Sequence, residues 1–255
     1  MFDVFTESQI AAFVVIALIT FVAGVVHSAI GFGFGIVALA LLPFIIDAEK
    51  AHVMMSMCSL PMLITAAAAY RDGIVWSSLR PALLGAAIMM PVGLFAFGSM
   101  SLDGLVRGTG LAILLMTLLN LRNKSTDFSG RATSESSRAS FIAGAISGLL
   151  GGAVSIAGPP IATFALQQGW KPERFKAFVT QCLLVVCCYK VIGLSVGGWV
   201  DRQSLFQAVW AAPFAMIGIK LGEVVSRKID AVKFQWVVSA ALIAVACLMM
   251  YRGQP

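Results

Sequence analysis

Apolar stretches separated by short polar segments fill almost the whole chain. A helix needs about 20 mostly apolar residues to cross a bilayer. This length criterion predicts a set of unbroken membrane-spanning helices. They cover His52–Tyr70, Pro81–Ser99, Gly104–Leu121, Ala177–Val196, Leu205–Leu221 and Phe234–Met250.

Two further apolar stretches are interrupted by clustered glycines, at Ala23–Pro43 and at Ala143–Leu166. At an offset of 120 positions, Gly31 of the first stretch falls on Gly151 of the second. A broken helix is tolerated in a bilayer only where it is buried in protein or lines a wet cavity. In transporters, interrupted segments at matching places in two halves indicate the substrate site. The pattern therefore predicts that both breaks line one site.

The remaining elements repeat in the same order, and Ser56 falls on Thr180 at an offset of 124. We expect two homologous halves, residues 1–121 and 141–255, joined by a hydrophilic connector at residues 122–140. Each half would hold one broken hairpin followed by three spanning helices.

The distribution of basic residues predicts the orientation. The connector carries Arg122, Lys124, Arg131 and Arg138, which places it in the cytoplasm. The basic segment Lys171–Lys176 can also lie inside only if each broken stretch returns to its own side. The halves then have opposite orientations. The expected fold is an all-α integral membrane protein of two inverted-topology repeats, each a glycine-broken re-entrant hairpin plus three transmembrane helices.

Composition supports a membrane protein. The chain is 59% hydrophobic and only 12% charged, whereas a soluble domain carries about 25% charged residues. The net charge of +6 comes from basic loops without interleaved aromatic residues, so we expect no nucleic-acid binding. The first nine residues contain no Lys or Arg. We therefore expect the apolar run from Ile10 to be retained as a helix rather than removed as a signal peptide.

The sequence excludes the common catalytic arrangements. It contains no HExxH, no Walker loop, no CxxC and no Ser–His–Asp order. The five cysteines all lie in apolar stretches, which is typical neither of a disulfide framework nor of a metal site. We therefore expect no enzyme activity, no cofactor and no metal. Cys58 and Cys182 occupy matching positions, which leaves open that both face a shared cavity.

The breaks themselves predict an anion site. Helix N-termini present unpaired N–H groups and a partial positive charge. Half-helices that start near Gly33–Gly35 and Ser155–Gly158 would aim two such ends at one point. Glycine lets an anion approach the backbone, and serine adds a donor. The alternative is that the glycines only allow close helix packing.

Two ionisable side chains lie in apolar stretches near the breaks. A charged Lys190 facing lipid would cost at least about 2.5–3.5 kcal/mol, so Lys190 either reaches the membrane surface or faces a cavity. His27 either donates to an anion, carries a proton or packs as a polar core residue. Hydroxyl and amide side chains, Ser59 and Ser147 among them, are candidate polar liners. The expected substrate-binding residues are Gly31, Phe32, Gly33, Phe34, Gly35, His27, Ser28, Ser56, Gly151, Gly152, Ser155, Gly158, Thr180, Gln181 and Lys190.

A glycine-rich element that ends in proline occurs in both halves, as Gly24…Gly31-Phe-Gly33-Phe-Gly35…Pro43 and as Gly144…Gly148…Gly151-Gly152…Gly158-Pro159-Pro160. Together with the chain length and the two homologous halves, this element resembles that of the TauE/SafE family of bacterial permeases, identified as sulfite or organosulfonate exporters. The resemblance covers nearly the whole length. Phe32, Phe34 and the segment Ala153-Val154-Ser155 depart from the glycines of the family, and these departures would reshape a small-anion pocket.

The resemblance implies a multi-pass secondary transporter in the bacterial inner membrane. Its substrate would be a small sulfur-containing anion such as sulfite, sulfoacetate or another organosulfonate, whose acceptor oxygens suit two helix ends. Phe32 and Phe34 would pack against an organic moiety, which favours an organosulfonate. The expected partners are this anion and the lipid bilayer, and a homodimer is left open. The alternative is a membrane-bound sulfur-handling or assembly protein that uses Cys58 and Cys182.

Overall fold

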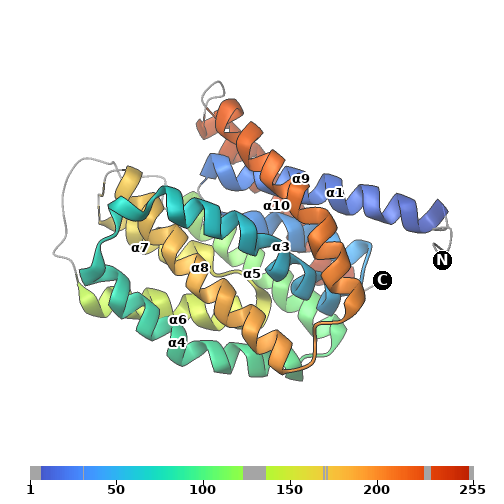
Figure 1. Cartoon of the computed structure of the whole chain (residues 1–255), viewed down its shortest axis with the longest axis horizontal. Helices are drawn as coiled ribbons and strands as arrows, with labels where there is room; N and C mark the ends of the chain where they lie inside the picture. Colours follow the sequence, from blue (N-terminus) through green and yellow to red (C-terminus); the bar gives the residue numbers. More distant parts are fainter. Residues whose placement is uncertain are drawn as a thin grey trace.

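The computed structural model describes residues 7–30, 32–122, 136–168, 170, 172–226 and 231–252, which form helices and turns with no strand among them (Figure 1). A short 3-10 turn follows α2, and another joins α3 to α4. The helices are α1 (Glu7–Ile30), α2 (Phe34–Leu41), α3 (Ala48–Ala69), α4 (Trp76–Ser99), α5 (Leu102–Arg122), α6 (Ser137–Val154), α7 (Gly158–Gln167), α8 (Pro172–Val196), α9 (Arg202–Ser226) and α10 (Ala231–Arg252).

Six helices of the described chain are long and apolar enough to cross a membrane, namely α1, α3, α4, α6, α8 and α9. Large apolar side chains, including Leu18, Phe95 and Ile192, are exposed along them. So much exposed apolar surface would drive a soluble protein to associate, whereas in a bilayer it faces acyl chains. The all-helical, multi-pass membrane fold expected from the sequence is confirmed.

In each broken stretch the first helix is long and the second is short. The 24 residues of α1 measure about 36 Å, which exceeds the hydrocarbon thickness of about 30 Å. The first arm of each broken stretch, α1 or α6, is among the six helices that are long and apolar enough to span, whereas α2 and α7 are half-length. The expected spans Gly104–Leu121 and Phe234–Met250 form α5 and α10, which are not among the six.

Glycines bring two pairs of helices into backbone contact. Gly24 of α1 lies against the Ala215 carbonyl of α9, and Gly144 of α6 lies against the Ala82 carbonyl of α4. A Cβ atom at either glycine would overlap the facing carbonyl, so these positions cannot carry a side chain without moving the helices apart. The pairs α1–α9 and α4–α6 follow from this small-residue packing (Figure 1).

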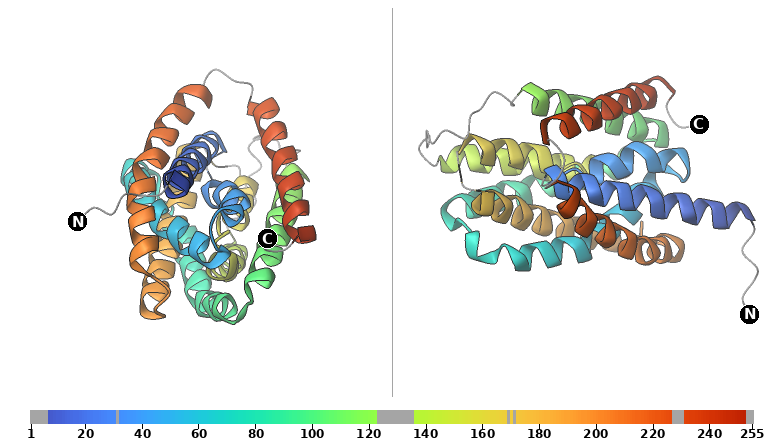
Figure 2. Two further views of the ribbon diagram at one scale, coloured as in Figure 1. Left: turned by 90° about the vertical axis from the view of Figure 1, so that its right-hand side faces the viewer. Right: turned by 90° about the horizontal axis from the view of Figure 1, so that it is seen from above.

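The direction of α1 relative to α9 follows from two further contacts. Phe21 packs on Gly218 and Val25 packs on Gly222, so the helices run parallel. On another side of the molecule α5 packs along α10, where a Cβ on Gly110 would lie 3.0 Å from an α10 carbonyl (Figure 2).

At the centre of the molecule, α3 and α8 run in opposite directions. Cys187 of α8 contacts Ser56 and Ser59 of α3. Earlier in α8, Gln181 donates to the carbonyl of Ala67, later in α3, at 3.0 Å. This antiparallel pair holds the most deeply buried of the six spanning helices, α3.

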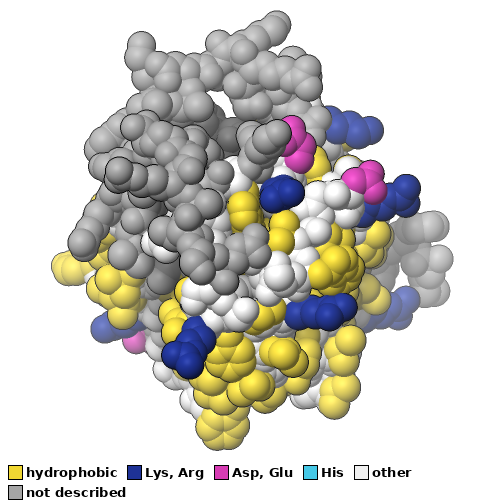
Figure 3. Space-filling model, turned by 90° about the vertical axis from the view of Figure 1, so that its left-hand side faces the viewer, with side chains coloured by type: hydrophobic (Ala, Val, Ile, Leu, Met, Phe, Trp, Pro, Cys, Tyr) yellow, Lys and Arg dark blue, Asp and Glu magenta, His cyan; other side chains and the backbone are white. Residues whose placement is uncertain are grey.

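Segments that the basic residues assign to the cytoplasmic side lie together at one end. Gly73 packs against the backbone of Glu173, and the Ser140 hydroxyl donates to the Ser78 carbonyl. Figure 3 views this end and shows Lys and Arg side chains spread over it. The exposed basic residues of these segments are Arg71, Arg80, Arg138, Arg174 and Lys176.

The opposite end gathers the segments assigned to the outside. The Trp199 ring packs on Gly98 at the end of α4. Asp201 caps α9 by accepting from the Ser204 N–H at 2.6 Å. Hydrogen bonds from Ser204 lower the pKa of Asp201, and nearby Lys50 lowers it further. Segments that the charge pattern assigns to the same side of the membrane therefore lie at the same end of the molecule.

Candidate functional site

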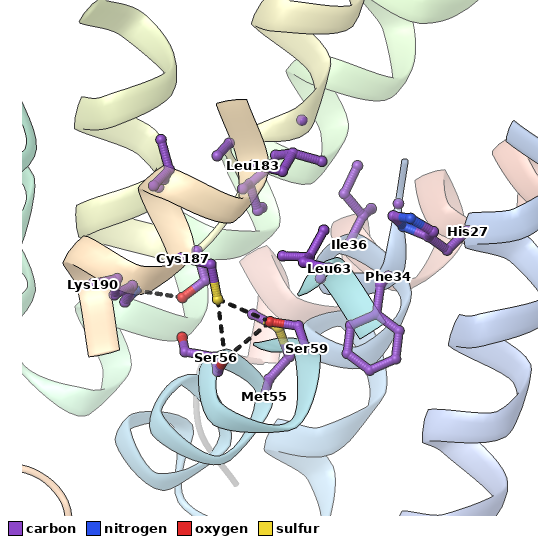
Figure 4. Close-up of a pocket in the computed structure, with 18 of the residues that line it drawn as sticks. His27, Phe34, Ile36, Met55, Ser56, Ser59, Leu63, Leu183, Cys187 and Lys190 are labelled. Atoms are coloured by element: carbon purple, nitrogen blue, oxygen red, sulfur yellow. Dashed lines mark hydrogen bonds between the residues drawn. The ribbon is translucent and has the colours of Figure 1, made fainter. Parts of the chain in front are cut away.

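A cavity lies where the two helix breaks meet α3 and α8 (Figure 4). About 80 Å³ of it is open to the centre of a water-sized sphere. One water molecule needs about 10–15 Å³ on this measure. The cavity thus has room for several waters or for one small anion, and both halves of the chain contribute to its wall.

The first break brings the N-terminus of α2 to the cavity. Gly33 precedes the helix with a φ of +114°, which other residues rarely adopt. Gly33, Phe34 and Gly35 all line the cavity. Because the first N–H groups of a helix lack intrahelical partners and carry partial positive charge, this end offers amide donors to a bound anion.

The second break has a different structure. Helix α6 ends at Val154, and the next residue, Ser155, is the single non-glycine residue of the described chain with a positive φ, at 57°. Helix α7 then begins with Gly158, Pro159 and Pro160. Proline has no N–H, so this end offers fewer amide donors than α2. The breaks touch each other, since a Cβ on Gly35 would lie 2.9 Å from the Ser155 carbonyl oxygen.

Lys190 places an amine, which is positively charged when protonated, on the side where α7 lacks amides. Its side chain is 2% exposed and lines the cavity. Its Nζ donates to the Gly152 carbonyl at 3.0 Å and to the Ser155 hydroxyl, and lies 5.0 Å from the ring centroid of Phe97. The sequence left two positions open for this side chain, the membrane surface and a cavity. In the structure Lys190 faces the cavity (Figure 4).

Behind Ser155 lies a buried histidine that the sequence did not single out for the site. His52 Nδ1 is 3.0 Å from Ser155 Oγ, and its Nε2 is 3.1 Å from Thr109 Oγ1. Both ring nitrogens are therefore satisfied, and a continuous chain of polar groups runs from Lys190 into α5.

Two aromatic side chains in contact with each other lie between these polar groups and the end of the molecule where α9 begins. The ring of Phe97 makes edge contacts with His52 and with Trp199, each at 5.7 Å between centroids. Trp199 belongs to the turn before α9. The polar groups around Lys190 are thus covered by rings on the side where Asp201 is exposed.

The cysteine of the cavity wall is Cys187. Its thiol donates to the Ser56 carbonyl and lies 3.2 Å from the Ser59 hydroxyl. Cys58 and Cys182 are both buried and neither is part of the lining. The shared cavity that the sequence left open for these two is lined by a different thiol.

Nine of the expected binding residues line the cavity. They are His27, Gly33, Phe34, Gly35, Ser56, Gly151, Ser155, Gly158 and Lys190. Ser59 lines it as well, whereas Ser147 donates to the Ala157 carbonyl at 2.6 Å and so stabilises the second break. The structure brings these residues together from segments more than 150 positions apart.

The remaining expected residues lie elsewhere. Gly31 is outside the described residues. Phe32 packs against Gly158 between the two breaks, and Ser28 packs against Gly222 of α9. The residues outside the lining are Phe32, Ser28, Gly152, Thr180 and Gln181.

Several apolar liners were not expected to bind. In α8 they precede Lys190 by three, four and seven positions, which is the spacing of one helix face. Once Lys190 is assigned to the cavity, this spacing identifies the α8 liners from the sequence. The liners of the other elements have no such signal. The apolar liners that were not expected are Ile36, Met55, Met62, Leu63, Ile156, Ala157, Pro159, Leu183, Val186 and Cys187.

Comparison with known proteins agrees with this architecture. Neither a curated protein nor a solved structure matches the chain. The family model described as "Sulfite exporter TauE/SafE" matches residues 16–249. That range contains both breaks and every residue that lines the cavity. The chain therefore belongs to the sulfite exporter TauE/SafE family.

Proposed function

We propose that this membrane transport protein is a secondary transporter that carries one small sulfur-containing oxyanion at a time through the cavity between its breaks. One observation carries the proposal. Lys190 places a buried cation in the cavity wall, while the start of α2 at Phe34 lies on the other side (Figure 4). No carboxylate lines the cavity among the described residues. A bound anion would supply the missing counter-charge.

The arrangement of donors suits a tetrahedral or pyramidal sulfur oxyanion. Sulfite and sulfonates present three acceptor oxygens, and charge-assisted hydrogen bonds to such oxygens are strong. Lys190 and the amides near Gly35 lie around one small space, which the Ser59 hydroxyl also lines while it donates to the Ser56 carbonyl at 2.9 Å. We expect the oxyanion to bind between Lys190 and the α2 N-terminus.

The rest of the wall favours a substrate with an apolar part. Phe34, Met55, Met62, Leu183 and Val186 line the same cavity. Apolar walls with a few placed polar groups are typical of sites for small organic molecules. We therefore propose a small organosulfonate, such as sulfoacetate, in preference to bare sulfite.

We further propose that residues 1–121 and 141–255 are inverted repeats in the cell inner membrane. A two-fold axis in the membrane plane would turn the α1–α9 pair into the α6–α4 pair and would lay α3 antiparallel to α8. The observed helix pairs and the antiparallel α3–α8 contact support this symmetry. Rocking of one repeat against the other would expose the cavity to each side in turn.

The test is exchange by the purified protein in proteoliposomes. Vesicles loaded with unlabelled sulfoacetate or sulfite would take up the same labelled anion from outside without any ion gradient. A matched pair of variants then addresses the site. Lys190→Met removes the cavity cation, and Lys220→Met removes an exposed lysine of α9.

We expect Lys190→Met to lower the apparent affinity in the exchange assay about 10–150-fold, because a hydrogen bond to a charged group contributes about 1.5–3 kcal/mol. Lys220→Met should exchange like the wild type. Both variants should elute as folded protein in detergent. Wild-type vesicles that exchange neither anion, or equal exchange by the two variants, would contradict the proposal.

A further inference from the structure

Lys190 and His52 share one hydroxyl. The Ser155 Oγ accepts from Lys190 Nζ and lies 3.0 Å from His52 Nδ1. His52 Nε2 continues to Thr109 Oγ1 at 3.1 Å. Lys190, His52 and Thr109 are each at most 2% exposed.

The chemistry of the groups allows these hydrogen bonds to run in one direction. An ammonium has donors only, so Ser155 Oγ accepts from Lys190 and can give its own O–H to His52 Nδ1, the arrangement that we take for the chain. The neutral imidazole then carries its proton on Nε2 and donates it to Thr109. All donors point the same way along the chain.

This order allows an excess proton to occupy either end. A proton passes from Lys190 Nζ to Ser155 Oγ as the Ser155 hydroxyl proton passes to His52 Nδ1. Lys190 is left as a neutral amine, Ser155 regains its hydroxyl, and His52 becomes an imidazolium with a proton on each nitrogen. No other reactant is needed.

We propose that this Lys190–Ser155–His52–Thr109 chain is a proton-binding site, and that the anion is bound and carried together with a proton held on it. The proposal rests on the anion transport proposed above. A buried cation without a counter-charge is costly, and an anion in the cavity supplies that charge. Proton and anion therefore favour each other's binding, by the same factor in both directions.

Two titratable groups besides Lys190 line the cavity, and the Lys190–Ser155–His52–Thr109 chain includes neither. The other titratable groups of the cavity wall are His27 of α1, on its far side (Figure 4), and Cys187 of α8. On α5, Asp103 and Arg107 bond to each other at 2.9 Å and are half exposed. Among the described residues, no Asp, Glu, Lys or Arg of α2, α3, α4 or α6 lines the cavity.

The experiment uses wild-type protein in proteoliposomes, with labelled sulfoacetate and with the membrane potential clamped at zero. Sulfoacetate keeps a constant charge near neutral pH, so its own titration does not contribute. A proton gradient of about one pH unit can concentrate a substrate carried with one proton up to about tenfold. We expect the anion to accumulate on the alkaline side. A trapped pH indicator should report proton movement in the same direction as the anion.

Variants separate the proton chain from anion binding. His52→Gln should abolish accumulation driven by the pH gradient, whereas gradient-free exchange should continue with an apparent affinity lowered by the coupling between proton and anion, because His52 itself does not line the cavity. Thr109→Val removes the last acceptor and should lower accumulation about fivefold. Its matched control is Thr20→Val, since Thr20 is equally buried but bonds only to carbonyls of its own helix. Thr109→Val serves as the test if His52→Gln does not fold.

The outcomes distinguish the two proposals. Vesicles with no exchange at all overturn anion transport and this inference together. Normal exchange without accumulation or proton movement in a pH gradient overturns the inference alone. Equal loss of accumulation in Thr109→Val and Thr20→Val also overturns it, because the loss would then not depend on the hydrogen bonds that join Lys190, Ser155, His52 and Thr109.

Discussion

At the scale of single residues, Ser155 has the greatest influence on the cavity. Its backbone closes α6 in the left-handed region, its hydroxyl joins Lys190 to His52, and its carbonyl packs on Gly35. The sequence marks Ser155 as a departure from the glycines of the family. Why a residue with a side chain occupies this backbone conformation becomes clear only from its hydroxyl contacts.

Two substitutions separate the roles of Ser155. Ser155→Gly and Ser155→Ala both remove the hydroxyl, so both should lower exchange of labelled sulfoacetate to a similar extent. Only alanine keeps the strain of a left-handed residue, roughly 1–2 kcal/mol. Ser155→Gly should therefore unfold in detergent at a higher temperature than Ser155→Ala. Wild-type exchange by Ser155→Gly would show that the hydroxyl is not needed.

The position of the Lys190 side chain could not be predicted from the sequence. The cost of a lysine facing lipid restricts it to the membrane surface or to a cavity, but sequence position does not decide between them. Its location was decided by tertiary contacts, with the Gly152 carbonyl and the Ser155 hydroxyl. His52 was missed for the same reason, since its partners Ser155 and Thr109 are 103 and 57 positions away.

At the scale of elements, the helix breaks could be predicted because glycine and proline act locally. The expected starts near Gly33–Gly35 and Ser155–Gly158 correspond to α2 at Phe34 and α7 at Gly158. The faces that α3 and α8 turn to the cavity have no such marker. Met55 and Leu183 look like any apolar residue of a membrane helix, and packing alone makes them liners.

Helix packing gives a test at the element scale. Gly144→Ala would push a Cβ into the Ala82 carbonyl of α4, and overpacking of this kind costs about 1–3 kcal/mol. Gly108→Ala is the matched control, because its nearest neighbour would be the Met100 sulfur at 4.0 Å. Alanine is favoured over glycine in a helix by about 0.8–1.0 kcal/mol.

In thermal unfolding in detergent, Gly144→Ala should therefore melt below wild type and Gly108→Ala at or above it. The opposite order, or equal melting temperatures, would show that the α4–α6 contact does not limit stability.

At the scale of the whole molecule, the helix pairs and the charges of the ends point to one arrangement. The α3–α4 turn packs on the start of α8, and the α8–α9 turn packs on the end of α4. If the halves are inverted repeats, these two turns face opposite sides of the membrane. The side of each turn could be predicted from charge alone, because basic residues in short loops set the membrane orientation without the help of tertiary contacts.

Cysteine labelling decides the orientation. Asp72 lies in the first turn with its side chain 96% exposed, and Gln203 is exposed just after the second. Asp72→Cys and Gln203→Cys would each be placed in a chain whose five native cysteines are replaced. In sealed inside-out vesicles, a membrane-impermeant maleimide should label position 72 and not position 203, and right-side-out vesicles should give the reverse. Labelling of both positions from one side would rule out inverted repeats, and with them an alternating-access movement about an axis in the membrane plane.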